Sequence, residues 1–343
     1  MIARPSGSAR ILCLVLALLC ISCEDQKSTT ASSGLFPVDQ DGKTGYVNAS
    51  GTVVITPQFE DGGDFSGGIA LVRMGGRWGY IDTDGKIVIN PQFDKASAFA
   101  EDLAAVRVGN RYGYVDRDGK IVINPQFDLA FPFSEGLARV KTGGKWGYVD
   151  KDGKLAISLQ FDDEGGFASG LAPVKTGGKF GFVDPDGKLA IPPQFDNATG
   201  FAEGMAAVKA GGMWGYIDQD AKILINPQYG DAGPFSESLA AVKVNGKYGY
   251  IDKDGKVMID PQFQKALPFT EGLAAVRLGG KWGFIGADGK MVISPQFADA
   301  AGFSADVARV RAVDKFGLIN KSGQFVWSHP IRVKEEEEQD DSW

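Results

Sequence analysis

One period dominates this chain of 343 residues: an aromatic residue followed by glycine returns every 34 positions. The pairs that define the repeat are Trp78–Gly79, Tyr112–Gly113, Trp146–Gly147, Phe180–Gly181, Trp214–Gly215, Tyr248–Gly249, Trp282–Gly283 and Phe316–Gly317. One step earlier, Thr44 and Gly45 keep the register without the aromatic residue. Nine units without an insertion form a tandem array, so the fold must be built from one repeated element.

The residues within one unit predict strands and not helices. A typical unit, residues 103–136, has short apolar segments rich in Val, Ile and Tyr that Gly, Asp or Pro interrupts. No helix of about ten residues fits between these breaks. We therefore predict three antiparallel strands at 103–108, 111–116 and 120–124, with Pro125 ending the third because proline cannot donate to a sheet. An irregular crossing at 129–136 leads to the next unit.

Two turns join the predicted strands. The first is "GN" in this unit and "GG" or "NG" in others, which is a signal for a two-residue hairpin. The second is "DRDG", in which glycine is expected to take the left-handed position that closes a type I turn. Ala221 replaces that glycine in one unit, where it should strain the turn by about 1 kcal/mol.

The alternation of side chains along a strand predicts how units pack. Trp146 and Tyr148 share one face, whereas Gly147 and Val149 share the other. Glycine within a strand indicates close approach by another backbone or ring, and we expect the neighbouring unit there. A three-stranded meander cannot bury its own apolar faces, but stacked meanders can. The predicted fold is all-β: nine three-stranded antiparallel meanders stacked into an open solenoid. A closed β-propeller-like ring is the alternative, although propellers usually have four strands per blade and four to eight blades.

The start of the chain has the pattern of an export signal. Arg4 and Arg10 precede an apolar run at 11–21, which ends at Ser22 and Cys23. This resembles a bacterial lipobox, with residues 1–22 as the signal peptide and Cys23 as the lipidated residue. Ordinary secretory cleavage nearby is the alternative.

The rest of the chain then divides into three parts. Residues 23–34 are expected to be a flexible linker, 35–333 the repeat array of nine units, and 334–343 an acidic disordered tail. The cysteines are Cys13, Cys20 and Cys23, so an acylated mature chain has no free thiol and no disulfide.

The unit "KWGYID-x-DGK-x-VI-x-PQFD-x-A-x-x-FSEGLA" resembles that of the WG-repeat family of bacterial proteins, over residues 35 to about 329. The resemblance implies a β-rich scaffold without an assigned reaction, here in the form of a bacterial lipoprotein.

Several repeated polar groups could bind a ligand, but each also has a structural interpretation. The "D-x-D-G" turns resemble the start of a calcium loop, yet a strand begins too soon after them, which favours turn chemistry. The glutamine of "PQF" is expected to bond to backbone in the adjoining turn, although an exposed binding ladder is possible. Rows of acids (such as Glu101 and Glu135) and of bases (such as Arg107 and Lys141) either engage a charged partner or form a solvated surface that prevents edge pairing; we favour the latter.

The composition argues against catalysis. His329 is the single histidine, and the acidic residues recur in every unit, whereas an active site needs one asymmetric cluster. The net charge of −7 disfavours nucleic acid as a partner. No catalytic, cofactor-binding or metal-binding residue is predicted, so we expect no enzyme and no cofactor.

The expected function is a non-catalytic cell-envelope scaffold that binds a protein through a repeat-built surface. The alternative is a module that binds the cell wall or a polysaccharide through exposed aromatics. The expected partners are therefore an unknown protein or an envelope glycan, together with the membrane through the N-terminal lipid. The expected location is the outer membrane or periplasmic face of a bacterial envelope.

Overall fold

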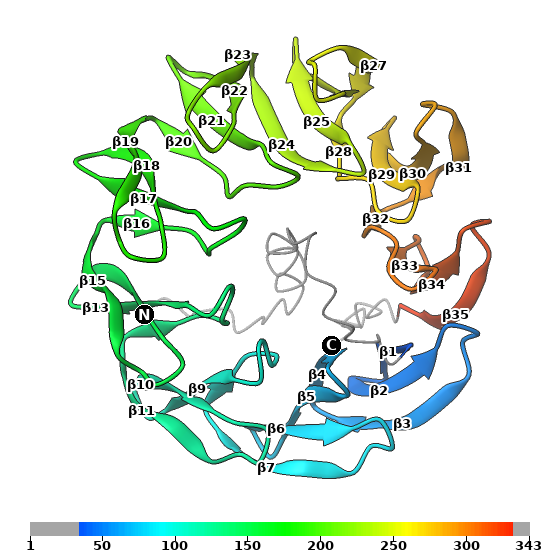
Figure 1. The fold of residues 1–343 in the computed structure, drawn as a ribbon. Coiled ribbons are helices and arrows are strands. Elements are labelled where there is room, and N and C mark those ends of the chain that lie inside the picture. The colour runs from blue at the N-terminus through cyan, green and yellow to red at the C-terminus, as the bar shows by residue number, and fades with distance from the viewer. Residues whose placement is uncertain (1–33, 332–343) are drawn as a thin grey trace, which may run out of the picture.

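The structure, a computed structural model, describes residues 34–331, which form strands and no helix. Nine antiparallel sheets follow one another around a ring, and the first and last sheets lie side by side (Figure 1). The described part of the chain is therefore a β-propeller of nine blades. The predicted open solenoid is wrong, and the closed ring that stood as its alternative is correct. The expected signal peptide, Cys23 and the tail lie outside the described residues.

Within the described residues, blade 1 has three strands, and each of the other eight blades has four. Blade 1 contains β1 (Leu35–Gln40), β2 (Lys43–Asn48) and β3 (Val53–Phe59). Blade 2 contains β4 (Asp61–Ser66), β5 (Ile69–Met74), β6 (Arg77–Asp82) and β7 (Ile87–Phe93). Blade 3 contains β8 (Lys95–Ala96), β9 (Ala104–Val108), β10 (Arg111–Val115) and β11 (Ile121–Phe127). Blade 4 contains β12 (Leu129–Ala130), β13 (Ala138–Thr142), β14 (Lys145–Val149) and β15 (Leu155–Phe161).

The remaining blades repeat this order. Blade 5 contains β16 (Asp163–Glu164), β17 (Ala172–Thr176), β18 (Lys179–Val183) and β19 (Leu189–Phe195). Blade 6 contains β20 (Asn197–Ala198), β21 (Ala206–Ala210), β22 (Met213–Ile217) and β23 (Ile223–Tyr229). Blade 7 contains β24 (Asp231–Ser236), β25 (Leu239–Val244), β26 (Lys247–Ile251) and β27 (Val257–Phe263). Blade 8 contains β28 (Lys265–Ala266), β29 (Leu273–Leu278), β30 (Lys281–Gly286) and β31 (Met291–Phe297). Blade 9 contains β32 (Asp299–Ala300), β33 (Val307–Arg311), β34 (Lys315–Asn320) and β35 (Phe325–Pro330).

The innermost strand of each four-stranded blade was not revealed by the sequence; it has only two residues in six blades and six residues in β4 and β24. The crossing predicted as irregular contains β12, where Leu129 pairs with Lys141 and Ala130 with Val140. Two paired residues are too few to show a strand pattern in a sequence. This strand belongs to the next blade, so each of blades 2 to 9 combines the end of one 34-residue unit with the start of the following one.

Proline does not end the third predicted strand, because that strand lies at the outer edge of the blade. β11 continues through Pro125 to Phe127, and its register with β10 shifts at Tyr112 and Tyr114. A side chain on Gly113 would meet Ile123 O at 2.3 Å and Pro125 N at 2.7 Å. The glycine that recurs at this position therefore leaves room for a bulge within its own blade. Our expectation of a neighbouring unit at this position is wrong.

Aromatic pairs join consecutive blades. The ring of Tyr114 in blade 3 lies 4.9 Å from that of Phe133 on the inner segment of blade 4. The Tyr114 hydroxyl donates to Phe131 O at 2.8 Å, and burial raises the pKa of the phenol. Eight such ring pairs link successive blades: Tyr46–Phe65, Tyr80–Phe99, Tyr114–Phe133, Tyr148–Phe167, Phe182–Phe201, Tyr216–Phe235, Tyr250–Phe269 and Phe284–Phe303.

The small residues beside these rings allow the blades to approach closely. Ala104 packs in the cluster between blades 2 and 3, whereas Ala105 packs in the cluster between blades 3 and 4. Both alanines are almost completely buried. The prediction that neighbouring units cover one another's apolar faces is confirmed.

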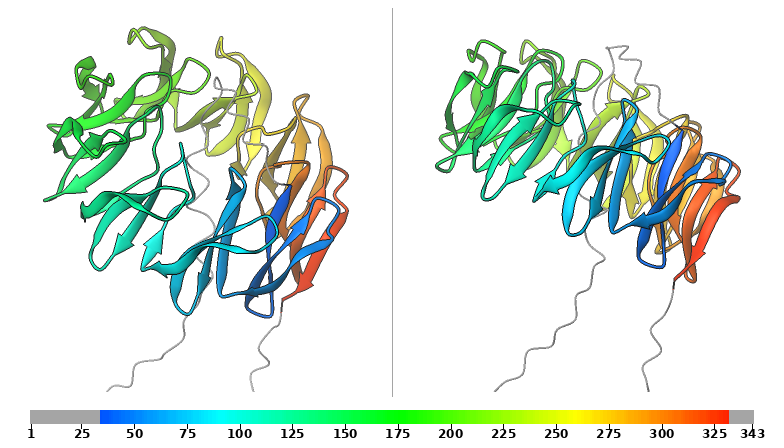
Figure 2. Two further views of the ribbon diagram at one scale, coloured as in Figure 1. Left: turned by 60° about the horizontal axis from the view of Figure 1, so that its bottom comes forward. Right: turned by 90° about the horizontal axis from the view of Figure 1, so that it is seen from below.

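The turns divide the ring into two faces, because successive strands of a blade run in opposite directions (Figure 2). The face that carries the β13–β14 turn at Gly143 and Gly144, and its equivalents, is here called the GG face. Both glycines have positive φ, of 58° and 82°, as a two-residue hairpin of this kind requires. The opposite face carries the "D-x-D-G" turns and the innermost turns, and is called the DG face.

Candidate functional site

The row of glutamates on the DG face braces one blade against the next. Glu101 in the innermost turn of blade 3 accepts hydrogen bonds from Gly136 N in blade 4, the shorter at 3.0 Å. Equivalent bonds join Glu135 to Gly170, Glu203 to Ser238, Glu237 to Gly272 and Glu271 to Asp306. These carboxylates therefore have a structural partner, and our interpretation of the row as a merely solvated surface was incomplete.

These glutamates also have an unusual backbone conformation. Glu101, Glu135 and Glu203 have φ of 50° to 53°, a region that non-glycine residues seldom occupy. Such strain persists only where surrounding contacts enforce it. The bond to the next blade and, for Glu101, an ion pair with Lys151 at 3.1 Å provide those contacts.

The basic row lies beside the aromatic residues that define the repeat. The ammonium group of Lys141 lies 5.0 Å from the ring centre of Trp146, and that of Lys175 lies 5.4 Å from the ring centre of Phe180. The cation and the ring are neighbours on paired strands, so each lysine stem covers part of the ring.

The aromatic residues of the repeat are covered to different extents. Trp146, Phe180 and Trp282 are buried, with 7 to 8% exposed. Trp78, Tyr112, Trp214, Tyr248 and Phe316 are half-buried. The four tryptophans therefore do not form a uniform exposed platform of the kind that a polysaccharide would stack on.

The "D-x-D-G" segments form turns, as predicted. Asp116 Oδ1 accepts hydrogen bonds from the amides of Asp118 at 3.1 Å and Lys120 at 2.9 Å, and Gly119 has φ of 77°. One carboxylate oxygen is thus used by the turn itself. Between residues 34 and 331 there is no group of three or more His, Cys, Asp or Glu side chains placed to hold a metal ion. The same residues include no helix of the length and apolar character needed to cross a membrane.

A repeated row of exposed apolar side chains lies on the outermost strands. The first two side chains of each such strand are 37 to 52% exposed in blades 1 to 8 wherever they are large and aliphatic. We call these fourteen residues the aliphatic belt: Val53, Val54, Ile87, Val88, Ile121, Val122, Leu155, Leu189, Ile223, Leu224, Val257, Met258, Met291 and Val292. The belt lies close to the DG face, because these residues directly follow the "D-x-D-G" turns.

Polar residues frame the belt. An exposed lysine precedes it in seven blades, at Lys86, Lys120, Lys154, Lys188, Lys222, Lys256 and Lys290. Further along the same strand the glutamine of "PQF" is exposed, as at Gln92 and Gln228. The glutamine at this position in blades 1 to 8 has no side-chain hydrogen bond within residues 34–331, so the predicted bond to backbone is wrong. The row is exposed, and a binding role for it stays a prediction.

Sequence reasoning missed the belt, although its signal is visible. Each outer strand begins with three apolar residues, as in "IVI" at 121–123. Simple alternation would predict that the first and third are buried and the second is exposed. Only Ile123 is buried, since an outermost strand has no neighbour on its far side. An apolar pair at the start of every outer strand therefore indicated an exposed row.

One interface contains an ion pair that departs from the repeat. Arg139 of β13 donates to both carboxylate oxygens of Glu164 in β16 at 3.3 Å, and its guanidinium lies 3.9 Å from the ring centre of Phe131. The Glu164 side chain is 1% exposed, and desolvation raises its pKa to about 7 despite the opposing effect of Arg139. Most other blades have alanine or proline in place of Arg139.

Comparison with known proteins identifies the repeat and the fold. Residues 45–315 match the profile of a family described as "WG containing repeat" in eight consecutive copies: 45–78, 78–112, 112–146, 146–180, 180–214, 214–248, 248–282 and 282–315. No curated protein sequence matches the chain. Among solved structures, one described as the crystal structure of the eukaryotic initiation factor is similar with a TM-score of 0.61 and 12% identity, over 87% of this chain and 96% of that chain. Dihydro-heme d1 dehydrogenase NirN is similar with a TM-score of 0.48 and 12% identity, over 77% of this chain and 73% of that chain.

Proposed function

The chain belongs to the WG-repeat family, and on that premise we propose that it is a non-catalytic scaffold of the bacterial cell envelope, exported and lipid-anchored through Cys23. Its proposed partner is a protein that docks on the aliphatic belt. The observation that carries this proposal is the exposure of fourteen large aliphatic side chains at the same two positions of eight outer strands. Repeated exposed apolar groups of this kind are typical of interaction surfaces.

The polar residues around the belt support a protein partner. The lysine that precedes the belt in seven blades hinders the pairing of edge strands with other copies of the chain, and so does proline at the fifth strand position, as in β7 and β23. The exposed side chains of the belt can still contact a complementary apolar surface on a partner. The exposed lysines and glutamines supply the polar rim that such interfaces use around an apolar centre.

A non-catalytic role agrees with how the repeated acids are used. The aspartates of the "D-x-D-G" turns bond to their own turn, and the glutamates of the innermost turns bond to the next blade. At least one oxygen of each of these carboxylates therefore stabilises the architecture. The incomplete exposure of the tryptophans weighs against the alternative role of polysaccharide binding.

Paired charge substitutions on one strand test the proposal. We expect the tagged full chain with Ile223→Asp and Leu224→Asp to lose a protein that co-purifies with the wild type from detergent-extracted envelopes. The matched control, Asn226→Asp with Gln228→Glu, adds the same charge to exposed positions of β23 and should retain it. Equal melting temperatures establish that both variants are folded.

The opposite outcome has a definite meaning. If the belt variant keeps every co-purifying protein, or if only insoluble polysaccharide retains the chain, docking on the belt is wrong. Quenching of tryptophan fluorescence by added polysaccharide would then favour the glycan-binding alternative.

A further inference from the structure

Among residues 34–331, blade 1 has no innermost strand of the kind that the other eight blades have. In blade 4 this strand bonds to β13: Asp128 N donates to Lys141 O at 2.8 Å, and Phe131 N donates to Arg139 O at 3.2 Å. Asp39 and Pro37 are the equivalents of Lys141 and Arg139 on β1. The described residues place no strand beside them.

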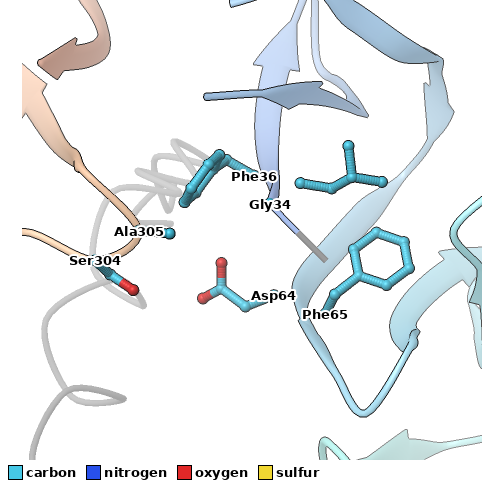
Figure 3. A pocket seen from close by; sticks show the side chains of 7 residues that line it. Gly34, Phe36, Asp64, Phe65, Ser304 and Ala305 are labelled. Atoms are coloured by element: carbon cyan, nitrogen blue, oxygen red, sulfur yellow. The ribbon is translucent and has the colours of Figure 1, made fainter. Parts of the chain in front are cut away.

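A cavity of about 70 Å³ marks the place of the missing strand. Phe36 lies on one side of it, Phe65 on the side of blade 2, and Ser304 and Ala305 on the side of blade 9 (Figure 3). Asp64 also lines the cavity, and it forms an ion pair with Arg309 of blade 9. This pair joins blades 9 and 2 across the position that an inner strand of blade 1 would occupy.

Between blades 9 and 1, Phe36 already supplies the aromatic ring that the inner strand supplies in the other blades. Every other blade has alanine at the place of Phe36, and an inner phenylalanine contacts a tyrosine or phenylalanine of the preceding blade. In blade 9, which precedes blade 1 around the ring, that tyrosine or phenylalanine position holds Leu318. Phe36 packs with Leu318 in the core between blades 9 and 1. An occupant of the vacant edge therefore needs a small residue where other inner strands have phenylalanine.

The charge beside the vacant edge is reversed. At the position of Asp39 the other eight blades have a basic residue: Arg73, Arg107, Lys141, Lys175, Lys209, Lys243, Arg277 and Arg311. Four of these face an inner-strand aspartate directly, at Asp61, Asp163, Asp231 and Asp299. Opposite charges on paired residues stabilise a sheet, so the occupant opposite Asp39 should be basic.

We propose that residues 27–33 of this chain dock on β1 as the fourth strand of blade 1. The segment "SSGLFPV" at 32–38 matches "ASGLAPV" at 168–174, where Ser169 and Gly170 form the turn into β17. Gly34 has φ of 62°, as such a turn requires. Counting back in this register places Lys27 opposite Asp39, Ser28 opposite Val38, and Ala31 at the position of the inner phenylalanine. The charge and the size requirements are both met.

The C-terminal segment is the competing occupant, because the chain leaves β35 where a further inner strand would follow. Continuing the repeat from blade 9 places Val333 opposite Asp39 and Glu337 at the position of the inner phenylalanine. Four successive glutamates, Glu335 to Glu338, would then lie beside Asp39 and Asp64. Like charges and a carboxylate against Phe36 and Leu318 disfavour this arrangement.

The docked strand also orients the ring on a membrane, and this step rests on the proposed lipid anchor. Inner strands begin at the GG face, so Lys27 lies there, and Cys23 precedes it by four residues, at most about 14 Å of chain. The lipid anchor would then lie at the GG face, near the start of the innermost strands. The DG face and the aliphatic belt near it then point away from the bilayer.

Disulfide trapping in the purified full chain tests the docking without a lipid or a partner. With Cys13, Cys20 and Cys23 replaced by serine, Lys27→Cys with Asp39→Cys should oxidise to at least half the yield of Leu129→Cys with Lys141→Cys, the equivalent pair in blade 4. Val333→Cys with Asp39→Cys should stay below a tenth of that yield, as measured by mass spectrometry of tryptic peptides. A high yield for the 333 and 39 pair, or a low yield for both pairs, overturns the proposal.

Charge exchange provides a second and independent measurement. Asp39→Lys and Lys27→Glu should each lower the melting temperature, and the double variant should recover most of the loss. Asp39→Lys with Lys334→Glu is the matched control and should show no recovery. Recovery in the control alone identifies the C-terminal segment as the occupant. These results concern docking only, so a failed belt experiment leaves them unaffected.

Discussion

The eight interfaces between successive blades and the ninth, which closes the ring, bury apolar surface in different ways. An ordinary interface sets an aromatic ring of one blade against an inner phenylalanine of the next, with alanine beside them. The closing interface has Leu318 and Phe36 and no inner phenylalanine among the described residues. A leucine replaces one ring and a phenylalanine replaces an alanine, so similar volume is redistributed. Closure of a repeat array thus depends on the residues that depart from the repeat.

Polar contacts at the closing interface also differ from the repeated ones. Arg309 and Asp64 join blades that are not consecutive in the chain, and His329 Nε2 lies 3.7 Å from Asp41 Oδ1. Gly51 of blade 1 has φ of 82°, and a side chain there would meet Val326 O at 1.8 Å. The last outer strand therefore contacts the backbone of blade 1 directly, which no residue other than glycine permits.

Removing the closing aromatic residue should have the largest effect. We expect Phe36→Ala to lower the free energy of unfolding by about 3 to 5 kcal/mol, since the ring is 8% exposed and no inner phenylalanine replaces it. Chemical unfolding measures the loss, and small-angle X-ray scattering measures whether the ring opens. Phe201→Ala, in an ordinary interface, is the control: it should destabilise to a similar extent without expanding the native particle. Equal scattering for both variants would contradict a special role for Phe36.

The two arginines at equivalent positions sharpen the comparison. Arg139 faces Glu164, which is 1% exposed, whereas Arg309 faces Asp64, which is 64% exposed. Arg139→Ala leaves a carboxylate buried without a partner and should cost about 3 kcal/mol at pH 8. Arg309→Ala should cost less than about 1 kcal/mol, because water solvates the remaining aspartate. Chemical unfolding of both variants measures the difference, and equal losses would show that burial does not distinguish the two pairs.

The pH dependence of stability tests the same buried carboxyl group. The pKa of Glu164 is raised from its ordinary value of 4.5 to about 7, so the folded state holds the proton more tightly than the unfolded state. The stability from this group is fully present below pH 4.5 and is lost as the pH rises to about 7, by up to about 3 kcal/mol. We expect Glu164→Gln to flatten this part of the stability curve, measured by urea unfolding between pH 5 and 8. A variant curve parallel to that of the wild type would refute the raised pKa.

A control of opposite sign is available on the surface. A hydrogen bond from Lys179 lowers the pKa of Asp196, so the contribution of that carboxylate is present above its ordinary value of 3.8 and is lost as the pH falls below it. Asp196→Asn should therefore change the curve only at acidic pH.

Local features of the blades followed from the sequence, whereas the shape of the ring did not. The period, the turns at Gly119 and Gly144 and the alternation around Trp146 depend on neighbouring residues, which a sequence displays directly. The two-residue strand β12 gives no periodic signal, and closure depends on the summed rotation of nine units, which no single unit encodes. The exposed belt was missed because an edge strand and a covered strand have similar apolar composition.

The ends of the array did carry a signal for closure. Phe36 stands where the other blades have alanine, and Leu318 stands where they have tyrosine or phenylalanine. These departures compensate each other in volume although 282 residues separate them. Two unrelated caps facing solvent would not need to match. Complementary departures at the two ends of an array therefore indicate a ring, and they offer a criterion for other tandem repeats.

The smallest expected effect concerns a departure inside the array, which nothing at the closing interface compensates. Ala221 has φ of 63° at a turn position where the other eight blades have glycine. Its methyl group packs against the core between blades 5 and 6. Ala221→Gly should relieve the backbone strain but lose that contact, for a net gain of about 0.5 to 1 kcal/mol. Gly255→Ala is the converse: φ is 79° and the nearest atom, Ile225 Cγ1, lies at 3.4 Å, so strain dominates its expected loss of about 1 kcal/mol. Thermal unfolding measures the change in stability of both variants. A loss of stability in Ala221→Gly would mean that packing outweighs strain at this turn.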